Sequence, residues 1–259
     1  MKKSLRILLI NEKGCFDPGV IALSKILSSR HKVVVVAPLQ AQEGIGHALT
    51  STKPIRATQF FPLSRVKIFG VNGTPCDCVG IALDKLLKQP PDLIISGIDH
   101  YNNRGETIYS SGIVSSAISG TLHGVKSIAL SACVANPKRE REFLSVARAF
   151  MRKLQYFYNN LPADTTLNVN YPRKFNSKKI KCVQLTHNMV DNFYTHEVNP
   201  FGREFYWMDN EVMGHGLECL DQKGDVYWLK QGFITLTPLK YDLTSDTALD
   251  VLNISGIGV

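Results

Sequence analysis

The sequence contains no long apolar run, and this absence excludes a membrane-spanning protein. No stretch approaches the roughly 20 apolar residues that a transmembrane helix requires. The apolar run 7–10 follows a basic start, but it is much shorter than the core of a secretory signal and ends in Asn-Glu-Lys-Gly. We therefore predict a soluble, cytoplasmic protein that has no membrane partner.

Cysteine is scarce and dispersed, which argues against a disulfide framework and against a structural zinc site. Six cysteines are spread over 259 residues, whereas disulfide-stabilised domains are short and rich in cysteine. Cys76 and Cys78 are close together, but their spacing is too short for a zinc knuckle and no second pair follows. Internal repeats and low-complexity tracts are also absent. The length suits one large α/β domain or two small ones.

Acidic residues are fewer than basic ones, which favours an anionic partner. The chain carries 30 Lys and Arg against 22 Asp and Glu, a formal net charge of +8, and such a surplus steers anions toward a protein. The basic residues are scattered, and the short cluster Lys138, Arg139 and Arg141 is typical of the solvated start of a helix. Nucleic acid, whose binding would depend strongly on salt, is therefore the partner we rank last.

Apolar, β-branched runs alternate with amphipathic segments through the first 170 residues. We expect buried strands at 5–10, 33–37, 66–71, 93–96, 127–131 and 167–170. We expect helices from 18 onward and at 77–88, 111–124 and 139–158, with Asp77 as a cap. This alternation predicts an α/β fold with a mostly parallel sheet covered on both faces and joined by right-handed connections.

The pattern weakens after about residue 173. Strands are expected at 180–184 and 233–238, and the segment between them is aromatic and irregular, with Phe205-Tyr206-Trp207. Two interpretations stay open for this segment. It is either a protruding arm or hairpin that packs on another subunit, or an internal subdomain.

Charged residues follow successive strands of the predicted sheet. Glu12 and Lys13 follow the first strand, Glu43 lies in the loop after the second, and Asp99 follows the strand at 93–96. Sheets of this type bind ligands beyond the carboxyl ends of their strands. Each residue alone would be an ordinary solvated loop residue, but together Glu12, Glu43 and Asp99 suit a hard divalent cation, Mg²⁺ or Mn²⁺.

A second group of residues is suited to a phosphate. Ser111 and Gly112 begin a predicted helix, where a Ser cap and free backbone N–H groups bind anions. Asn103 lies in the loop after the strand at 93–96 and is expected to hold the same phosphate. His100 is a candidate proton carrier. The simpler alternatives are a plain helix cap and a solvated loop histidine.

Six ordered motifs make this sequence similar to the SurE family, the metal-dependent nucleotidases also called stationary-phase survival proteins. They are GTPCDCV at 73–79, SGID at 96–99, SGIV at 111–114 with Ala117 and Gly120, LNVNYP at 167–172, Pro200 with Gly202, Arg203 and FYW at 205–207, and GFITLTPL at 232–239. The resemblance implies a Rossmann-like, doubly wound α/β domain over 1–259. It also implies that 173–259 includes a protruding C-terminal arm, exchanged between the subunits of a homodimer or homotetramer.

The resemblance further implies hydrolysis of nucleoside monophosphates to nucleoside and phosphate with a divalent metal. The departures fall on the four metal-ligand positions. The family has two aspartates where this chain has Glu12 and Lys13, a serine at Glu43 and an asparagine at Asp99. The formal charge of the set is unchanged, because the extra carboxylates offset the lysine. Ile113 and Ser119 replace a threonine and a glutamate of the family motif.

Two interpretations of the altered set follow. Either Glu12, Glu43 and Asp99 hold the ion and Lys13 contacts the phosphate, or the Lys13 ammonium replaces the cation and pairs with Glu12 or Asp99 in an internal salt bridge. Lysine is not a ligand in either case, because an ammonium has no lone pair. The protein is accordingly predicted to be a metal-dependent 5'-nucleotidase, with Glu12, Asp99 and His100 catalytic. The alternative, supported by Ile113, is a pseudoenzyme that binds nucleotide or phosphate as a regulatory oligomer.

Overall fold

A nine-stranded sheet forms the centre of the protein in the computed structural model, which describes residues 4–60, 66–187, 194–208 and 222–254. Its strand order is β3-β4-β2-β1-β5-β6-β7-β11-β8. The strands are β1 (Arg6–Ile10), β2 (Lys32–Pro38), β3 (Ala57–Phe60), β4 (Lys67–Val71), β5 (Leu93–Asp99), β6 (Ser127–Ala132), β7 (Thr166–Tyr171), β8 (Ile180–Cys182) and β11 (Ile234–Leu239). The six strands from β4 to β7 are parallel, whereas β3 runs antiparallel to β4 and β11 antiparallel to β7.

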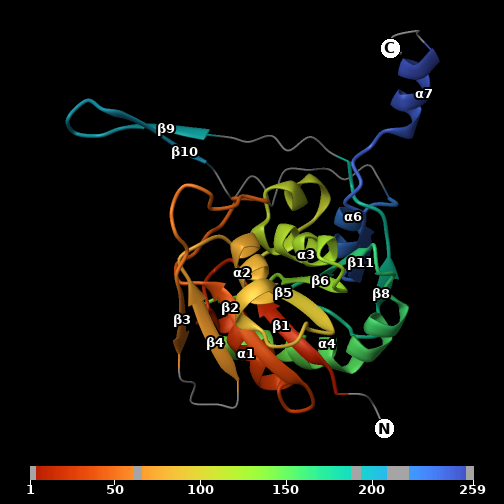
Figure 1. Ribbon diagram of the computed structural model, residues 1–259. Coiled ribbons are helices and arrows are strands. Elements are labelled where there is room, and N and C mark those ends of the chain that lie inside the picture. Colours follow the sequence, from red (N-terminus) through yellow and green to blue (C-terminus); the bar gives the residue numbers. More distant parts are fainter. Residues whose placement is uncertain (1–3, 61–65, 188–193, 209–221, 255–259) are drawn as a thin grey trace.

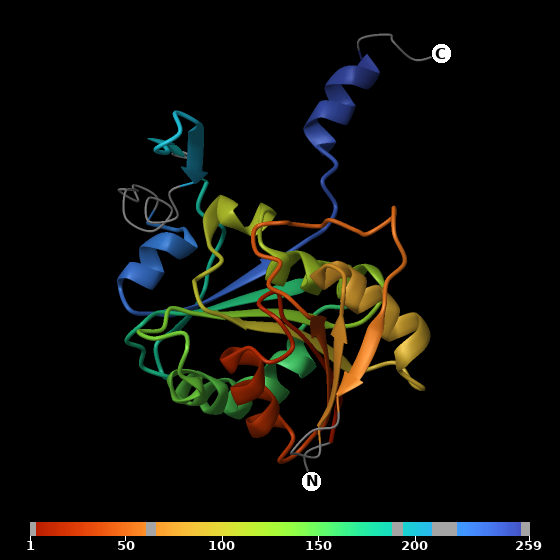
Figure 2. The same cartoon turned by 90° about the vertical axis from the view of Figure 1, so that its left-hand side faces the viewer.

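Helices cover both faces of the sheet (Figures 1 and 2). One face carries α1 (Pro18–Leu27) and α4 (Glu140–Asn160), and the other carries α2 (Pro75–Ile81) and α3 (Gly112–Leu122). Side chains of β1 alternate between the two cores: Ile7 packs on the α1 side, whereas Leu8 packs on the α2 side. This two-sided burial explains why the inner strands read as continuous apolar runs. The predicted mostly parallel, doubly wound α/β fold is confirmed.

Local capping accounts for one correction to the expected helix bounds. The helix expected at 77–88 begins at Pro75, because Thr74 is its N-cap and Asp77 completes a capping box. The α-helix ends at Ile81 and continues as one π-helical turn, η1 (Ala82–Leu86). The strand expected at 93–96 extends to Asp99, which places this carboxylate at the strand end.

Several elements were not predicted. They are the edge strand β3, the 3₁₀ helix η2 (Gly105–Tyr109), and the C-terminal helices α6 (Asp225–Lys230) and α7 (Asp246–Ile254). The expected strand at 180–184 is shorter than predicted, because pairing with β11 ends at Cys182. None of the helices in the described ranges is long and apolar enough to cross a membrane.

Two C-terminal segments extend away from the sheet and its helices (Figures 1 and 2). The first is an antiparallel hairpin of β9 (Tyr194–Val198) and β10 (Glu204–Met208), in which every strand residue is exposed. The second is α7, which follows β11. The aromatic segment predicted as either an arm or a subdomain therefore contains a projecting hairpin. That this arm serves oligomerisation stays a prediction.

Candidate active site at the carboxyl edge of the sheet

The structure brings the predicted charged residues together at the ends of β1 and β5. The Nζ atom of Lys13 lies 2.6 Å from Oε2 of Glu43 and 3.8 Å from Oδ1 of Asp99. Glu12, the neighbour of Lys13, reaches the first residue of α3. Four residues from three separate loops thus form one cluster, which we call the strand-end cluster (Glu12, Lys13, Glu43 and Asp99).

Glu12 is buried and occupies the start of α3. Its side chain accepts a hydrogen bond from the Gly112 backbone N–H at 2.8 Å, and the residue is only 5% exposed. A side chain at 112 would displace the Glu12 carboxyl group, because an added Cβ would lie 2.8 Å from Oε2 of Glu12. Burial, together with the nearby charge of Asp99, raises the pKa of Glu12 to about 8. The amide that was expected to meet a phosphate therefore already binds a carboxyl group of the protein.

Asp99 is held at the end of β5 by two hydrogen-bond donors. Its Oδ1 accepts from the His100 backbone N–H at 2.6 Å, and its Oδ2 accepts from Nδ2 of Asn103 at 2.9 Å. The pairing of β5 with β6 is irregular between Gly97 and Asp99, a feature that redirects side chains at strand ends. Burial raises the pKa of Asp99, while the Lys13 charge and these hydrogen bonds act in the opposite direction.

Lys13 is the positive centre of the cluster. Burial of its ammonium acts to lower its pKa, but the charges of Asp99 and Glu43 outweigh burial and raise the pKa above its usual value. Lys13 therefore remains a cation at neutral pH. Its side chain is 7% exposed, whereas that of its partner Glu43 is 56% exposed. The pair consists of a buried cation and a carboxylate that reaches it from an exposed loop.

His100 is directed toward the start of α1. Its Nε2 lies 2.7 Å from Oδ2 of Asp17, and its ring is 5.3 Å from that of Phe143. Asp17 is the N-cap of α1 and accepts from Gly19 through Oδ1. The observed contacts of His100 therefore link the β5 loop to α1. Its catalytic role stays a prediction.

Asn103 and Ser111 serve mainly local structure. Nδ2 of Asn103 donates to Asp99 and also lies 3.2 Å from Oγ of Ser131. Oγ of Ser111 accepts from the Val114 backbone N–H at 3.1 Å, which makes Ser111 the N-cap of α3. The predicted cap is confirmed, but phosphate binding by Asn103 and Ser111 is untested by these contacts.

Sequence reasoning missed the residues that hold the Asn103 loop. The backbone carbonyl of Asn103 accepts from Nδ2 of Asn168 at 2.7 Å and from Nδ2 of Asn170 at 2.8 Å. Asp225 accepts from the backbone N–H of Gly105 at 3.0 Å. The signal for the two asparagines was present, because polar residues in a fully buried strand need partners.

The strand-end cluster does not fit a divalent cation as its residues are placed. Across the described parts of the chain, no three His, Cys, Asp or Glu side chains are grouped so that they could hold a metal ion. The Lys13 ammonium contacts Glu43 and lies near Asp99, and both Asp99 oxygens already accept hydrogen bonds. Glu12 is engaged with Gly112. The predicted ligands are neighbours but do not form a free ligand set.

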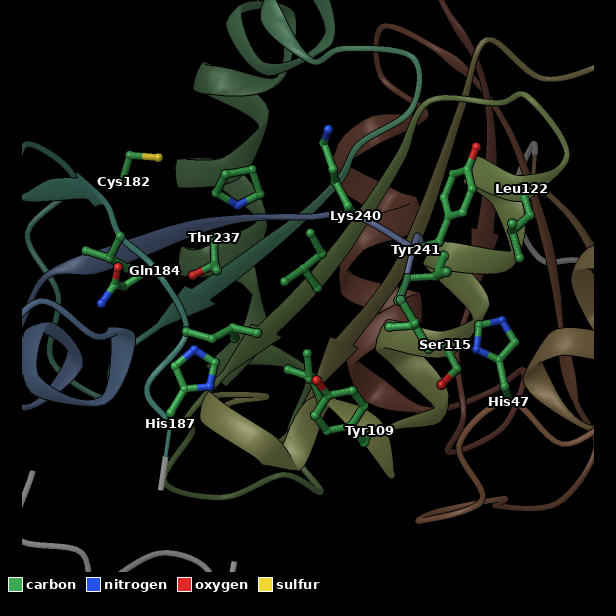
Figure 3. A pocket seen from close by; sticks show the side chains of 17 residues that line it. His47, Tyr109, Ser115, Leu122, Cys182, Gln184, His187, Thr237, Lys240 and Tyr241 are labelled. Carbon is green, nitrogen blue, oxygen red and sulfur yellow. The ribbon is translucent and has the colours of Figure 1, made fainter. Parts of the chain in front are cut away.

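A separate pocket of about 810 Å³ lies beside α3 (Figure 3). Tyr109, Ser115 and Leu122 line one side, and Thr237 of β11 lines another. None of the predicted site residues lines this pocket. It is therefore distinct from the strand-end cluster.

Fold and site together define a doubly wound α/β protein whose charged residues gather at the carboxyl edge of its sheet. The family model described as Survival protein SurE matches residues 7–195. A 5'-nucleotidase SurE of Thermoanaerobacter sp. (strain X514) is 33% identical over 250 residues, which cover 96% of this chain and 97% of that protein. The chain belongs to the SurE family.

Further relatives agree with this assignment over nearly the full length. A 5'-nucleotidase SurE of Geobacter metallireducens is 35% identical over 254 residues, covering 96% of each chain. The crystal structure of SurE protein from Aquifex aeolicus superposes with a TM-score of 0.75 at 33% identity, covering 96% of this chain and 98% of that one. The resemblance inferred from the six motifs is confirmed.

Proposed function

We propose that this protein is a phosphomonoesterase that hydrolyses nucleoside monophosphates to nucleoside and inorganic phosphate at the strand-end cluster. The observation that carries the proposal is the buried cation Lys13 at the carboxyl edge of the sheet, in a chain whose relatives are named 5'-nucleotidases. Doubly wound sheets bind their ligands at this edge. A buried ammonium is a strong partner for phosphoryl oxygens, because hydrogen bonds between charged groups are short and strong.

The residues of the chain would divide the work as follows. Lys13 binds a phosphoryl oxygen after the exposed Glu43 carboxylate has given way. Asn103 keeps Asp99 oriented at the strand end. Glu12 and Asp99 are the acidic groups next to the bound phosphate, and Glu12, whose pKa is raised to about 8, is suited to exchange a proton near neutral pH. Ser111 and Gly112 supply the positive end of α3.

The Mg²⁺ or Mn²⁺ ion remains the part of the prediction with the least structural support. The family resemblance implies such an ion, with Glu12, Glu43 and Asp99 as its ligands. Their present contacts leave no free ligand set. No step of the proposed reaction is therefore assigned to a metal.

A nucleotide panel tests hydrolysis directly. Purified full-length protein is incubated with 5'- and 3'-nucleoside monophosphates and p-nitrophenyl phosphate, in EDTA and with added Mg²⁺ or Mn²⁺, and phosphate release is measured. We expect release from nucleoside monophosphates and a loss of about 100-fold or more in Asp99→Ala. Asp84→Ala is the matched control, because Asp84 is exposed and pairs only with the exposed Lys85 in the described contacts. Absence of turnover under every condition would refute hydrolysis.

Nucleotide binding without hydrolysis is the second candidate, and the lack of a free metal-ligand set among the described residues favours it. Calorimetry with nucleoside monophosphates separates the two candidates. Binding without phosphate release would support the regulatory, pseudoenzyme interpretation, and neither binding nor release would contradict both.

The projecting hairpin and α7 are proposed to pack on another subunit in a homodimer or homotetramer. Phe205, Tyr206 and Trp207 are exposed on β10, and Leu249 and Leu252 are exposed on α7. Exposed apolar clusters of this kind mark interaction surfaces. Sedimentation equilibrium should show an oligomer that Trp207→Ser or Leu249→Asp weakens. A monomer at all concentrations would contradict the proposal.

A cytoplasmic location also stays a prediction.

A further inference from the structure

We infer that the Lys13 ammonium takes the place of a divalent cation in this chain, so that the strand-end cluster keeps its positive centre without binding a metal ion. The inference concerns the same site as the proposed function, but it does not depend on turnover. It follows from a disagreement between the metal that the family resemblance implies and the positions of this chain's residues.

The ammonium occupies the space between two of the three predicted ligands. Its Nζ atom is 2.6 Å from Glu43 Oε2 and 3.8 Å from Asp99 Oδ1. A metal bound to either carboxylate would lie about 2.0–2.6 Å from the oxygen. It would then be only a few ångströms from Nζ, where two positive charges repel strongly in a poorly solvated environment. The Lys13 side chain is only 7% exposed, so water screens this repulsion weakly.

Three carboxyl oxygens of the cluster already accept hydrogen bonds from the protein. His100 and Asn103 donate to the two oxygens of Asp99, and Gly112 donates to Glu12. A metal would therefore have to displace the ammonium and compete with protein donors at the same time. Lysine cannot contribute to a ligand set, because its charged form has no lone pair. The positive charge that partly offsets these carboxylates thus belongs to the chain itself.

An anion approaching this site would meet a fixed ammonium. The ammonium is held by Asp99 from within the structure and by Glu43 from an exposed loop. An incoming phosphate can compete with Glu43, whereas Asp99 stays in place at the strand end. The consequence is a site whose affinity for anions does not change when divalent ions are removed.

Direct Mn²⁺ binding tests the inference. Free Mn²⁺ is measured by electron paramagnetic resonance in titrations of the full-length wild-type protein, Lys13→Asp, Lys13→Met and Lys13→Arg. We expect no saturable Mn²⁺ site in the wild type or in Lys13→Arg. In Lys13→Asp we expect one site per chain, which binds Mn²⁺ at least about tenfold more tightly than any residual binding by the wild type. Lys25→Asp is the matched control, because Lys25 also pairs with a glutamate, at 2.7 Å, but on the exposed surface. It should behave like the wild type.

Thermal melts keep the test decisive if the aspartate variant folds poorly. Lys13→Met leaves the carboxylates without their cation, so Mn²⁺ should raise its Tm and leave the wild-type Tm unchanged. One saturable Mn²⁺ per wild-type chain, as tight as in Lys13→Asp, would overturn the inference. The inference would also be overturned if neither Lys13→Asp nor Lys13→Met gained Mn²⁺ binding or a Mn²⁺-dependent rise in Tm. These readouts are independent of phosphate release, so a silent nucleotide panel would contradict the proposed function and leave this inference standing.

Discussion

Two buried acidic regions of this protein differ in what surrounds their carboxylates. Asp225, at the start of α6, is fully buried and accepts from the backbone N–H groups of Gly105 at 3.0 Å and Thr186 at 3.1 Å. Glu12 and Asp99 are similarly buried, but they face each other and a lysine. Burial alone therefore does not distinguish the two regions.

The difference lies in whether the partners are fixed dipoles or other charges. The backbone amides of Gly105 and Thr186 compensate Asp225 by hydrogen bonding, which suits a structural role. In the strand-end cluster, burial and the proximity of Asp99 raise the pKa of Glu12 to about 8. Strongly perturbed acidic groups of this kind mark candidate functional sites. Three experiments test whether the two acidic regions differ in this way.

Removal of Asp225 should have the largest effect on stability. Asp225→Ala leaves the Gly105 and Thr186 amides buried without an acceptor, so we expect a loss of about 4 kcal/mol in the free energy of unfolding. Urea denaturation measures it, with Asp84→Ala as the exposed control, which should change stability by less than about 0.5 kcal/mol. A loss below about 1 kcal/mol would show that Asp225 is not a structural anchor.

The second experiment uses the pH dependence of stability. The pKa of Glu12 rises from 4.5 to about 8 on folding, so between these values the folded state binds more protons than the unfolded state. The contribution of Glu12 to the free energy of unfolding is therefore present at pH 4.5 and is lost as the pH approaches 8. Relative to Glu12→Gln, the wild type should therefore lose on the order of 2 kcal/mol between pH 5.5 and 8.

Urea denaturation of both proteins across this pH range gives the difference. Asp99 also makes stability fall with rising pH, because its pKa is raised, but it does so in both the wild type and Glu12→Gln. Parallel stability curves for the wild type and Glu12→Gln would mean that Glu12 is ionised throughout.

The smallest change in stability is expected at Glu43. Its side chain is 56% exposed, so Glu43→Gln should alter the free energy of unfolding by less than about 1 kcal/mol. Because Glu43 competes with a bound anion for Lys13, the same substitution should tighten phosphate binding severalfold in calorimetry. Asp84→Asn serves as the control for a change in net charge. Unchanged or weaker phosphate binding in Glu43→Gln would show that Glu43 does not cover the anion position.

The fold could be predicted where burial controls the sequence. Strand β1 is apolar from Ile7 to Ile10 because it lies between β2 and β5 and packs against helices on both faces. Strand β3 is an edge strand whose residues are exposed or half-buried, so it carries no apolar run to detect. Helix α6 has only six residues, too few to show a helical periodicity.

The position of the candidate site followed from topology, but its contacts did not. The ends of parallel strands indicated where Glu12, Lys13 and Asp99 would lie. Glu12 reaches Gly112 across 100 positions of sequence, and His100 reaches Asp17 across 83. Such pairs are decided by how helices dock on the sheet, which no local pattern encodes. The sequence left open whether Lys13 pairs with an acidic residue, and it did not indicate Glu43 as the partner.

The way in which the Asn103 loop is held has a consequence for chain synthesis. The loop that carries Asn103 and Gly105 is fastened by Asn168, Asn170 and Asp225, which leave the ribosome long after the loop itself. Strand β1 can find β2 while the chain is still short, but the loop beside Asp99 lacks one of its anchors until residue 225 has emerged. The region on which function is proposed to depend is therefore completed late in synthesis, and nascent chains cut short before α6 would carry it unfinished.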